Sequence, residues 1–249
     1  TFNPSVTALE HVKAGMIRSP YGLRLEDHTA FVRGREGAPT GENGIMDLDP
    51  RFTYPGIEVG IVPEGGFVHL AYQDENGVFG PNFQGGKLGA KAFSGKAGLL
   101  RGPVMLGVTA RTNGRGDVSP DTRATRYGAF AQFGCKAFVL TAEGDAGKNE
   151  PSGAGPDVKL LAAYLAGEYY AGRAWTLRAE INYMDHHLDL ADAGKEVSRR
   201  YGLGVELNPL PFLRLSANYR YVANSTAEVA GQAGTTDESW FIGYAVFSF

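Results

Sequence analysis

The feature that most constrains this chain is its last stretch, Asp237–Phe249, in which apolar residues alternate with small or polar ones up to a terminal phenylalanine. Successive side chains of a pleated strand point to opposite faces, so Phe241, Phe247 and Phe249 share one face. A soluble domain rarely ends on such a strand, because chain termini are usually polar and frayed. A strand that closes a membrane barrel requires this pattern, since its outer face meets lipid and both of its edges are paired. The stretch therefore favours a barrel strand over the last strand of a soluble sandwich.

Most of the chain divides into strand-length segments with the same two-residue alternation. In the clearest one, Leu213–Asn224, leucine, alanine and tyrosine alternate with arginine, serine and asparagine. Aromatic residues lie towards the ends of the strands, as the interfacial girdles of a membrane barrel require. The other predicted strands are Ile57–Val62, Phe67–Gln73, Lys87–Phe93, Val104–Arg111, Tyr127–Phe133, Ala137–Asp145, Val158–Tyr170, Trp175–Tyr183 and Tyr201–Leu207.

The predicted connections alternate between short and long. The short ones are Pro63–Gly66, Gly134–Lys136, Ala171–Arg173 and Asn208–Pro211, with Lys96–Pro103 as a somewhat longer member. The long ones are Gly34–Tyr54, Asp74–Gly86, Thr112–Thr125, Ala146–Pro156, Asp185–Arg199 and Asn224–Asp237. Short periplasmic turns at one rim and long extracellular loops at the other are typical of outer-membrane barrels. The predicted fold class is therefore all-β, a transmembrane antiparallel up-and-down β-barrel.

The number of strands depends on the first 55 residues, because eleven strands are predicted from Gly56 onward. Asp27–Arg33 supplies a twelfth, and His11–Arg18 then lies inside the barrel, at an edge, or as the remnant of a missing earlier strand. We therefore predict a single barrel domain over residues 1–249 with about twelve strands, and fourteen as the alternative.

Composition excludes several other classes. No window approaches the ~18–20 continuous apolar residues of a spanning helix. The mean hydropathy of −0.21 suits a barrel, in which only every second residue is apolar. A net charge of −3 argues against a nucleic-acid partner. The single cysteine, Cys135, forms no intrachain disulfide, and no spacing indicates a zinc or haem site, so no cofactor is expected. The first residues lack a signal peptide, which indicates a mature form or a chain whose beginning is missing.

The alternating residues before Phe249 resemble the C-terminal signature of bacterial outer-membrane β-barrel proteins, which the barrel-assembly machinery reads as a sorting signal. The resemblance implies a location in the bacterial outer membrane, among lipid and lipopolysaccharide, and recognition of the last strand by that machinery. A shorter segment, Gly15–Arg33, carries Pro20-Tyr21-Gly22 after a glycine-bearing strand. It is similar to an early-strand pattern of porin-like proteins, including phosphate-selective porin relatives and barrels that sheath electron-transfer cytochromes. The alternative interpretation is a structural bend that packs inside the barrel or against its rim.

The polar faces of the strands form the functional surface of a barrel. The predicted pore-lining residues are Arg111, Glu143, Glu168, Arg178, Glu180, Arg200, Glu206, Arg214 and Arg220; the same patterns place Glu58, His69, Gln73, Lys87, Lys91, Thr109, Gln132 and Thr141 on this side. Charged residues here either line a water-filled pore that selects solutes or pair into a network that fills the interior. The arginines could attract anionic solutes, or the glutamates could neutralise them across neighbouring strands.

Residues for catalysis or metal binding are not evident. Asp185, His186 and His187 form a polar cluster, but no third ligand is visible, and the loop aspartates do not form a calcium motif. The sequence thus predicts a porin-like channel for small hydrophilic solutes, with anionic solutes as a further hypothesis, and not an enzyme. One alternative is a non-conducting scaffold barrel that houses or anchors a partner protein in a secretion or electron-transfer complex. Another is an outer-membrane hydrolase.

Overall fold

The computed structural model describes residues 9–23, 54–74, 91–113, 122–151, 157–172, 174–188, 196–210, 213–229 and 232–247. Within these ranges, twelve strands form one sheet. The strands are β1 (Leu9–Ile17), β2 (Tyr54–Ile61), β3 (Gly66–Asp74), β4 (Lys91–Arg101), β5 (Val104–Asn113), β6 (Thr122–Gly134), β7 (Phe138–Pro151), β8 (Val158–Ala171), β9 (Trp175–Leu188), β10 (Glu196–Leu210), β11 (Leu213–Val229) and β12 (Gln232–Phe247).

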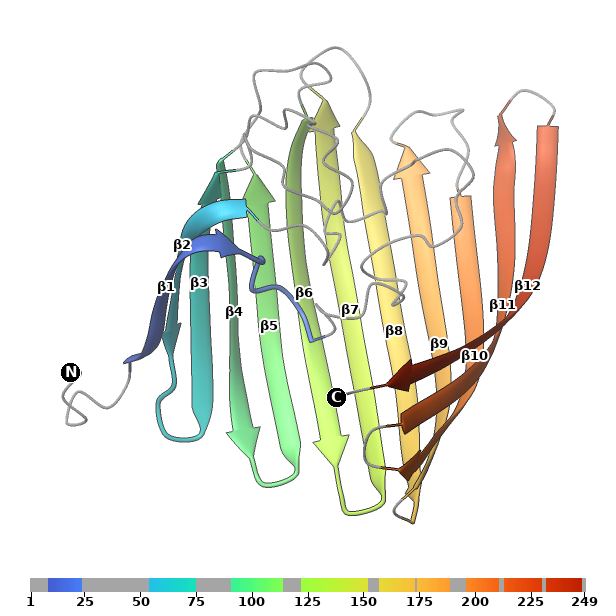
Figure 1. The fold of residues 1–249 in the computed structure, drawn as a ribbon. Coiled ribbons are helices and arrows are strands. Elements are labelled where there is room, and N and C mark those ends of the chain that lie inside the picture. Colours follow the sequence, from blue (N-terminus) through green and yellow to red (C-terminus); the bar gives the residue numbers. More distant parts are fainter. Residues whose placement is uncertain are drawn as a thin grey trace.

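The sheet is antiparallel and up-and-down, because each strand pairs with its neighbours in the chain, in the order β1 to β12. The predicted fold class is confirmed in this respect. The sheet curves so that both ends come forward around a concave face (Figure 1). Among the described residues no pairing joins β12 to β1, so the sheet is open at these two edges. The described ranges contain no helix of the length and apolarity that crossing a membrane requires.

The two faces of the sheet have opposite chemistry. Large apolar side chains stand out on the convex face, where Leu70 is 56%, Val108 59%, Leu203 64% and Phe241 75% exposed. The concave face buries polar and charged side chains, among them Gln73, Thr109, Arg111, Arg126, Glu143, Asp145, Glu180, Asn182, Arg200 and Arg220. A water-soluble sheet has the reverse distribution. Exposed apolar residues in a band along consecutive strands suit a wall that meets lipid.

Glycines on the concave face let large side chains lie flat across a neighbouring strand. A Cβ atom at Gly98 would stand 2.5 Å from Cζ of Phe67, and one at Gly202 would stand 2.5 Å from Cγ of Glu180. Real Cβ atoms do not approach other atoms this closely. Part of the glycine content, 35 residues, is thus explained by the room that inward-facing side chains require.

Of the three positions considered for His11–Arg18, the structure shows the one at an edge of the sheet. β1 pairs directly with β2, from Leu9 opposite Ile61 to Ile17 opposite Tyr54, so the N-terminal segment is an edge strand of the sheet. The predicted strand Asp27–Arg33 lies outside the described residues. The described sheet thus reaches twelve strands with β1 as its first.

Several predicted connections are partly strand. β7 continues to Pro151 in the predicted loop Ala146–Pro156, and the predicted loop Asp185–Arg199 is strand up to Leu188 and again from Glu196. β4 continues through Lys96 to Arg101, which pairs with Val104, so the predicted turn shrinks to Gly102 and Pro103. The predicted loop over Asn224–Asp237 is also mostly strand, because β11 and β12 pair up to Val229 opposite Gln232. The apolar alternation ends in this part of the sequence, but the backbone pairing of the two strands continues. The remaining short turns lie at one rim of the sheet, at the bottom of Figure 1.

One strand is predicted one residue out of phase. Lys91 was assigned to the polar face, but the neighbouring Ala92 is fully buried and Phe93 is 58% exposed, so Lys91 shares the convex face with Phe93. The mostly small residues before Phe93 leave the alternation without a clear phase. Asp145, the last residue of the predicted strand Ala137–Asp145, is 2% exposed within β7, which continues to Pro151.

Candidate functional site

A short segment that follows β1, Arg18–Leu23, crosses the concave face of the sheet; we call it the crossing segment. In Figure 1 it leaves β1 and runs in front of the middle strands. Its backbone N–H groups are bound by side chains of distant strands: Gly22 N donates to Thr109 Oγ1 on β5 (3.2 Å) and Leu23 N donates to Glu143 Oε2 on β7 (3.2 Å). The bend considered for Pro20-Tyr21-Gly22 therefore lies inside the curve of the sheet.

The start of the crossing segment is fastened to β3. Ser19 Oγ donates to Gln73 Oε1 (2.5 Å), and Gln73 Nε2 donates to the carbonyl oxygen of Ile17 (2.9 Å). Proline at position 20 ends the β1 ladder, and Gly22 adopts a φ of 63°, which glycine tolerates best. Tyr21 is completely buried. The local sequence thus turns the chain away from β1, and polar side chains of the sheet hold it in place.

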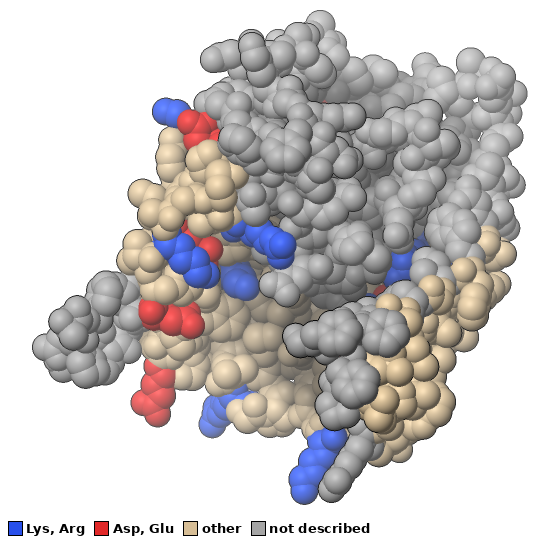
Figure 2. All heavy atoms as spheres, in the orientation of Figure 1, with Lys and Arg blue, Asp and Glu red and all other residues tan. Residues whose placement is uncertain are grey.

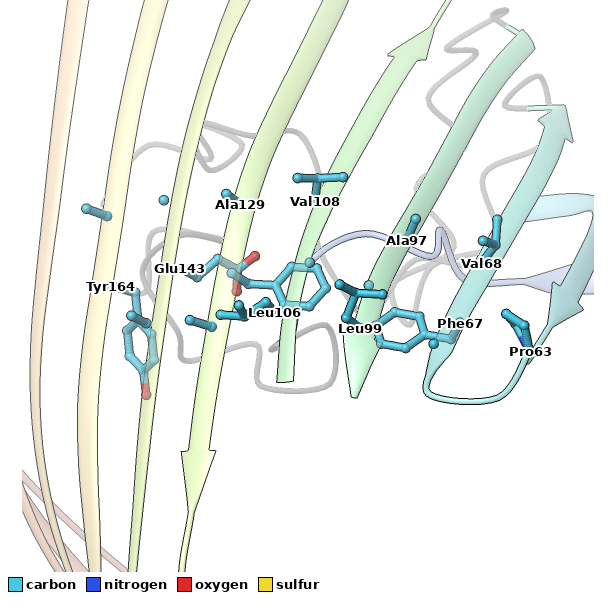
Figure 3. A pocket seen from close by; sticks show the side chains of 18 of the residues that line it. Pro63, Phe67, Val68, Ala97, Leu99, Leu106, Val108, Ala129, Glu143 and Tyr164 are labelled. Carbon is cyan, nitrogen blue, oxygen red and sulfur yellow. The ribbon is translucent and has the colours of Figure 1, made fainter. Parts of the chain in front are cut away.

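A hollow runs across β3 to β8 and reaches the turn between β2 and β3. It has a volume of about 1030 Å³ and reaches from Pro63 in the β2–β3 turn to Glu143, the residue that binds Leu23 N. Its lining is largely apolar, and Figure 3 shows Phe67, Glu143 and Tyr164 along it on β3, β7 and β8. Phe67 and Phe130 stack with ring centroids 6.3 Å apart.

A charged network occupies another part of the concave face, on β8 to β11. Its centre is Glu180, which is 6% exposed. Arg178 Nη2 donates to Glu180 Oε2 (2.9 Å), and Arg220 Nε and Arg200 Nη2 lie 3.7 Å and 3.8 Å from Glu180 Oε1. Gly202 stands between Glu180 and Arg220 in the register, so its missing side chain lets the carboxylate reach across β10.

The network is rich in arginine. Arg178 also lies 3.9 Å from Glu168 Oε1 and donates to the Tyr164 hydroxyl (3.0 Å). Arg178, Arg200 and Arg220 all lie within 4 Å of the Glu180 carboxylate, so charge pairing inside the wall is real and Glu180 is shared by three arginines.

The predicted pore-lining residues fall into three groups. Glu168, Arg178, Glu180, Arg200 and Arg220 belong to the network. Glu206 and Arg214 form a separate, more exposed pair, with Arg214 Nε 4.0 Å from Glu206 Oε2. Arg111 and Glu143 are buried on β5 and β7, where the crossing segment binds.

Some residues of this surface were missed in the sequence. Arg126, which directly precedes the predicted strand Tyr127–Phe133, is 1% exposed on the concave face. Asn182, which the alternation of Trp175–Tyr183 places on the polar face, is likewise 1% exposed there. The sequence around Tyr21 predicts a bend but does not predict that the ring is buried, because its burial depends on the tertiary fold. Asp185 accepts a hydrogen bond from Tyr183 Oη (3.1 Å), and the side chains of His186 and His187 lie outside the described residues.

No family model and no curated protein matches this chain. Solved structures of outer-membrane barrels do. OmpT of Vibrio cholerae, expressed in the outer membrane, is 14% identical, with a TM-score of 0.66 over 95% of this chain and 76% of that chain. Its in-vitro folded trimer form gives 13% identity and a TM-score of 0.68 over 95% and 76%. An anion-selective porin from Comamonas acidovorans is 15% identical, with a TM-score of 0.58 over 80% and 60%. At these identities the similarity shows the fold of outer-membrane β-barrel proteins.

Proposed function

We propose that this protein is an outer-membrane channel through which small hydrophilic, preferentially anionic, solutes diffuse. The observation that carries the proposal is the inverted distribution of residues, with apolar side chains exposed on the convex face and charged ones buried on the concave face. Such a wall has lipid on one side and a polar interior on the other. The similarity in fold to outer-membrane proteins and to an anion-selective porin supports the same proposal.

In this proposal the crossing segment narrows the interior of the channel, and the arginine-rich network selects the solutes that pass. A segment held on β3, β5 and β7 occupies space over the concave face without being part of the wall. Guanidinium groups bind carboxylate and phosphate oxygens in a bidentate geometry, so a concave face rich in arginine favours anions. The short turns face the periplasm, lipid and lipopolysaccharide surround the convex face, and the barrel-assembly machinery recognises the last strand.

Planar-bilayer recording on the detergent-folded protein tests the channel. We expect discrete, ohmic conductance steps, a reversal potential that indicates anion preference, and larger steps for Tyr21→Ala, because the fully buried ring belongs to the crossing segment. Tyr169→Ala is the matched control, since Tyr169 is 49% exposed on the convex face. A silent bilayer with correctly folded protein would exclude an open channel, and cation preference would exclude the assigned selectivity.

A scaffold barrel is the second candidate, and the largely apolar hollow favours it. A cavity of about 1030 Å³ that is lined by Phe67, Phe130 and Tyr164 suits an apolar part of a partner protein better than it suits hydrated ions. Copurification of a stoichiometric partner together with absent conductance would support this candidate. We propose no hydrolase activity, since no nucleophile with an oriented base is evident among the described residues.

A further inference from the structure

Two histidines and two carboxylates meet on the concave side of β1, β2 and β3. His11 and His69 lie with ring centroids 5.3 Å apart, and each ring stands between the same two carboxylates. On one side, Glu58 Oε1 is 2.9 Å from His11 Nε2 and 3.3 Å from His69 Nδ1. On the other, Glu10 Oε2 is 3.3 Å from His11 Nδ1 and 3.8 Å from His69 Nε2. Figure 2 shows acidic and basic side chains interspersed in this region, at the left of the view.

A break in the strand brings Glu10 and His11 together. Successive residues of a regular strand point to opposite faces. The β1–β2 register shifts between Leu9 and His11, so Glu10 is an extra residue without a partner opposite it. A β-bulge of this kind re-aims a side chain, and here it lets two adjacent residues approach the same histidine, His69 of β3. Gly60 leaves room for the His11 ring, since any Cβ there would collide with it.

The two sides of the histidine pair are not equivalent. Glu58 is nearly buried, with 9% of its side chain exposed, and Lys13 Nζ lies 3.5 Å from its Oε1. The lysine charge opposes a cation at that position. Glu10 is 51% exposed, so its side of the pair is open to solvent. If both rings donate an N–H to Glu58, His11 Nδ1 and His69 Nε2 keep their lone pairs on the open side.

We propose that Glu10, His11 and His69 bind a divalent transition metal ion of the Zn²⁺ type, with Glu58 orienting both imidazoles. The three ligand atoms all lie within 4.8 Å of one another. Tetrahedral zinc places its ligand atoms about 3.3 Å apart, given Zn–N and Zn–O bonds of about 2.0–2.1 Å, so small side-chain rotations close the site. A carboxylate that accepts the second N–H of a metal-bound histidine is a common support for such sites.

Two histidines and one glutamate leave a fourth coordination position for water or another ligand. The site joins β1, the edge strand, to β3 across β2, so a bound ion adds a cross-link at the open edge of the sheet. The ligands come from separate strands and from a bulge, which explains why the sequence showed no metal-binding spacing.

Metal binding by the full chain, folded in detergent, tests the proposal. Equilibrium titration with Zn²⁺ is expected to show one saturable site per chain, and Co²⁺ is expected to give the absorption bands of a tetrahedral ion. His69→Ala and Glu10→Gln should each abolish this site. Glu58→Gln should weaken it about 10- to 100-fold, because it removes only the support. Heat-dependent gel mobility, measured in parallel, reports whether each variant is folded.

Glu64→Gln is the matched control, because Glu64 is an exposed acidic residue in the adjacent β2–β3 turn, and it should bind Zn²⁺ as the unchanged protein does. The Glu10→Gln variant is expected to fold normally, because the Glu10 side chain is half exposed, so loss of Zn²⁺ binding in this variant would report on the site and not on folding. Absence of saturable binding, or unchanged affinity in folded His69→Ala, would overturn the site. Loss of binding in Glu58→Gln with unchanged affinity in Glu10→Gln would overturn the assignment of Glu10.

Discussion

Two regions of the concave face satisfy their buried polar groups in different ways. On β9 to β11, Glu180 meets Arg178, Arg200 and Arg220, all of which belong to the wall itself. On β3 to β7, by contrast, Gln73, Thr109 and Glu143 bind a segment from near the N-terminus. The first region is a network within the sheet, and the second is a contact between the sheet and a separate stretch of chain.

This difference predicts different responses to mutation. Losing Glu180 from the network leaves three arginines close together, which a folded sheet tolerates poorly. Losing a contact of the crossing segment removes a hydrogen bond between largely neutral groups, and the strands stay paired when the segment detaches. We therefore expect changes in the network to alter mainly the free energy of unfolding, and changes in the crossing segment to alter mainly the width of the proposed channel.

The largest effect is expected for Glu180→Gln. It leaves three arginines around a neutral amide, and we expect the free energy of unfolding to fall by about 3–5 kcal/mol. Urea unfolding in detergent, followed by gel mobility, measures the change. The control is Glu206→Gln. Glu206 and its partner Arg214 are 32% and 47% exposed, so the change should lower the free energy of unfolding by less than about 1 kcal/mol. Equal losses for the two variants would contradict a central position for Glu180.

A smaller effect is expected for Gly202→Ala, whose new methyl group meets the Glu180 side chain. Such overpacking costs about 1–3 kcal/mol. In a Glu180→Ala background the loss should largely disappear, because the obstructing side chain is gone; a double-mutant cycle measures this coupling. Gly144→Ala is the control, since its Cβ would meet nothing nearer than the Ala162 carbonyl oxygen at 4.0 Å. Additive effects of the two changes would show that Gly202 acts independently of the network.

The smallest effect on stability is expected for Ser19→Ala in the crossing segment. It removes the hydrogen bond to Gln73 and should lower the free energy of unfolding by about 0.5–1.5 kcal/mol. Amide hydrogen exchange at Gly22 and Leu23 should nevertheless become faster, because the segment detaches locally. Ser216→Ala, which loses a hydrogen bond from Asn218 on β11, should leave exchange in the crossing segment unchanged. Unaltered exchange at Gly22 in Ser19→Ala would show that the segment is held elsewhere.

Much of the wall could be predicted from the sequence because its alternation is local. Arg178, Glu180 and Arg220 were assigned to one face, because the alternation within each strand shows which of its two faces is apolar. The prediction was wrong where this alternation is weak, as at Lys91 beside small residues. It was also wrong where a strand continues into a polar stretch, as over Asn224–Asp237. The apolar alternation marks only the part of a strand whose outer face is apolar, whereas the length of the strand depends on backbone hydrogen bonds.

The sequence by itself therefore determined the class of fold, the apolar face of the sheet and most of the residues on the other face. Only the tertiary structure decided which of those residues meet. The crossing segment reaches Glu143, and the bulge at Glu10 turns two adjacent side chains towards His69. The physical reason is that the face to which a side chain points is fixed by the two-residue period of its own strand. Contacts across a curved sheet depend instead on register, on bulges and on the room left by glycines such as Gly202.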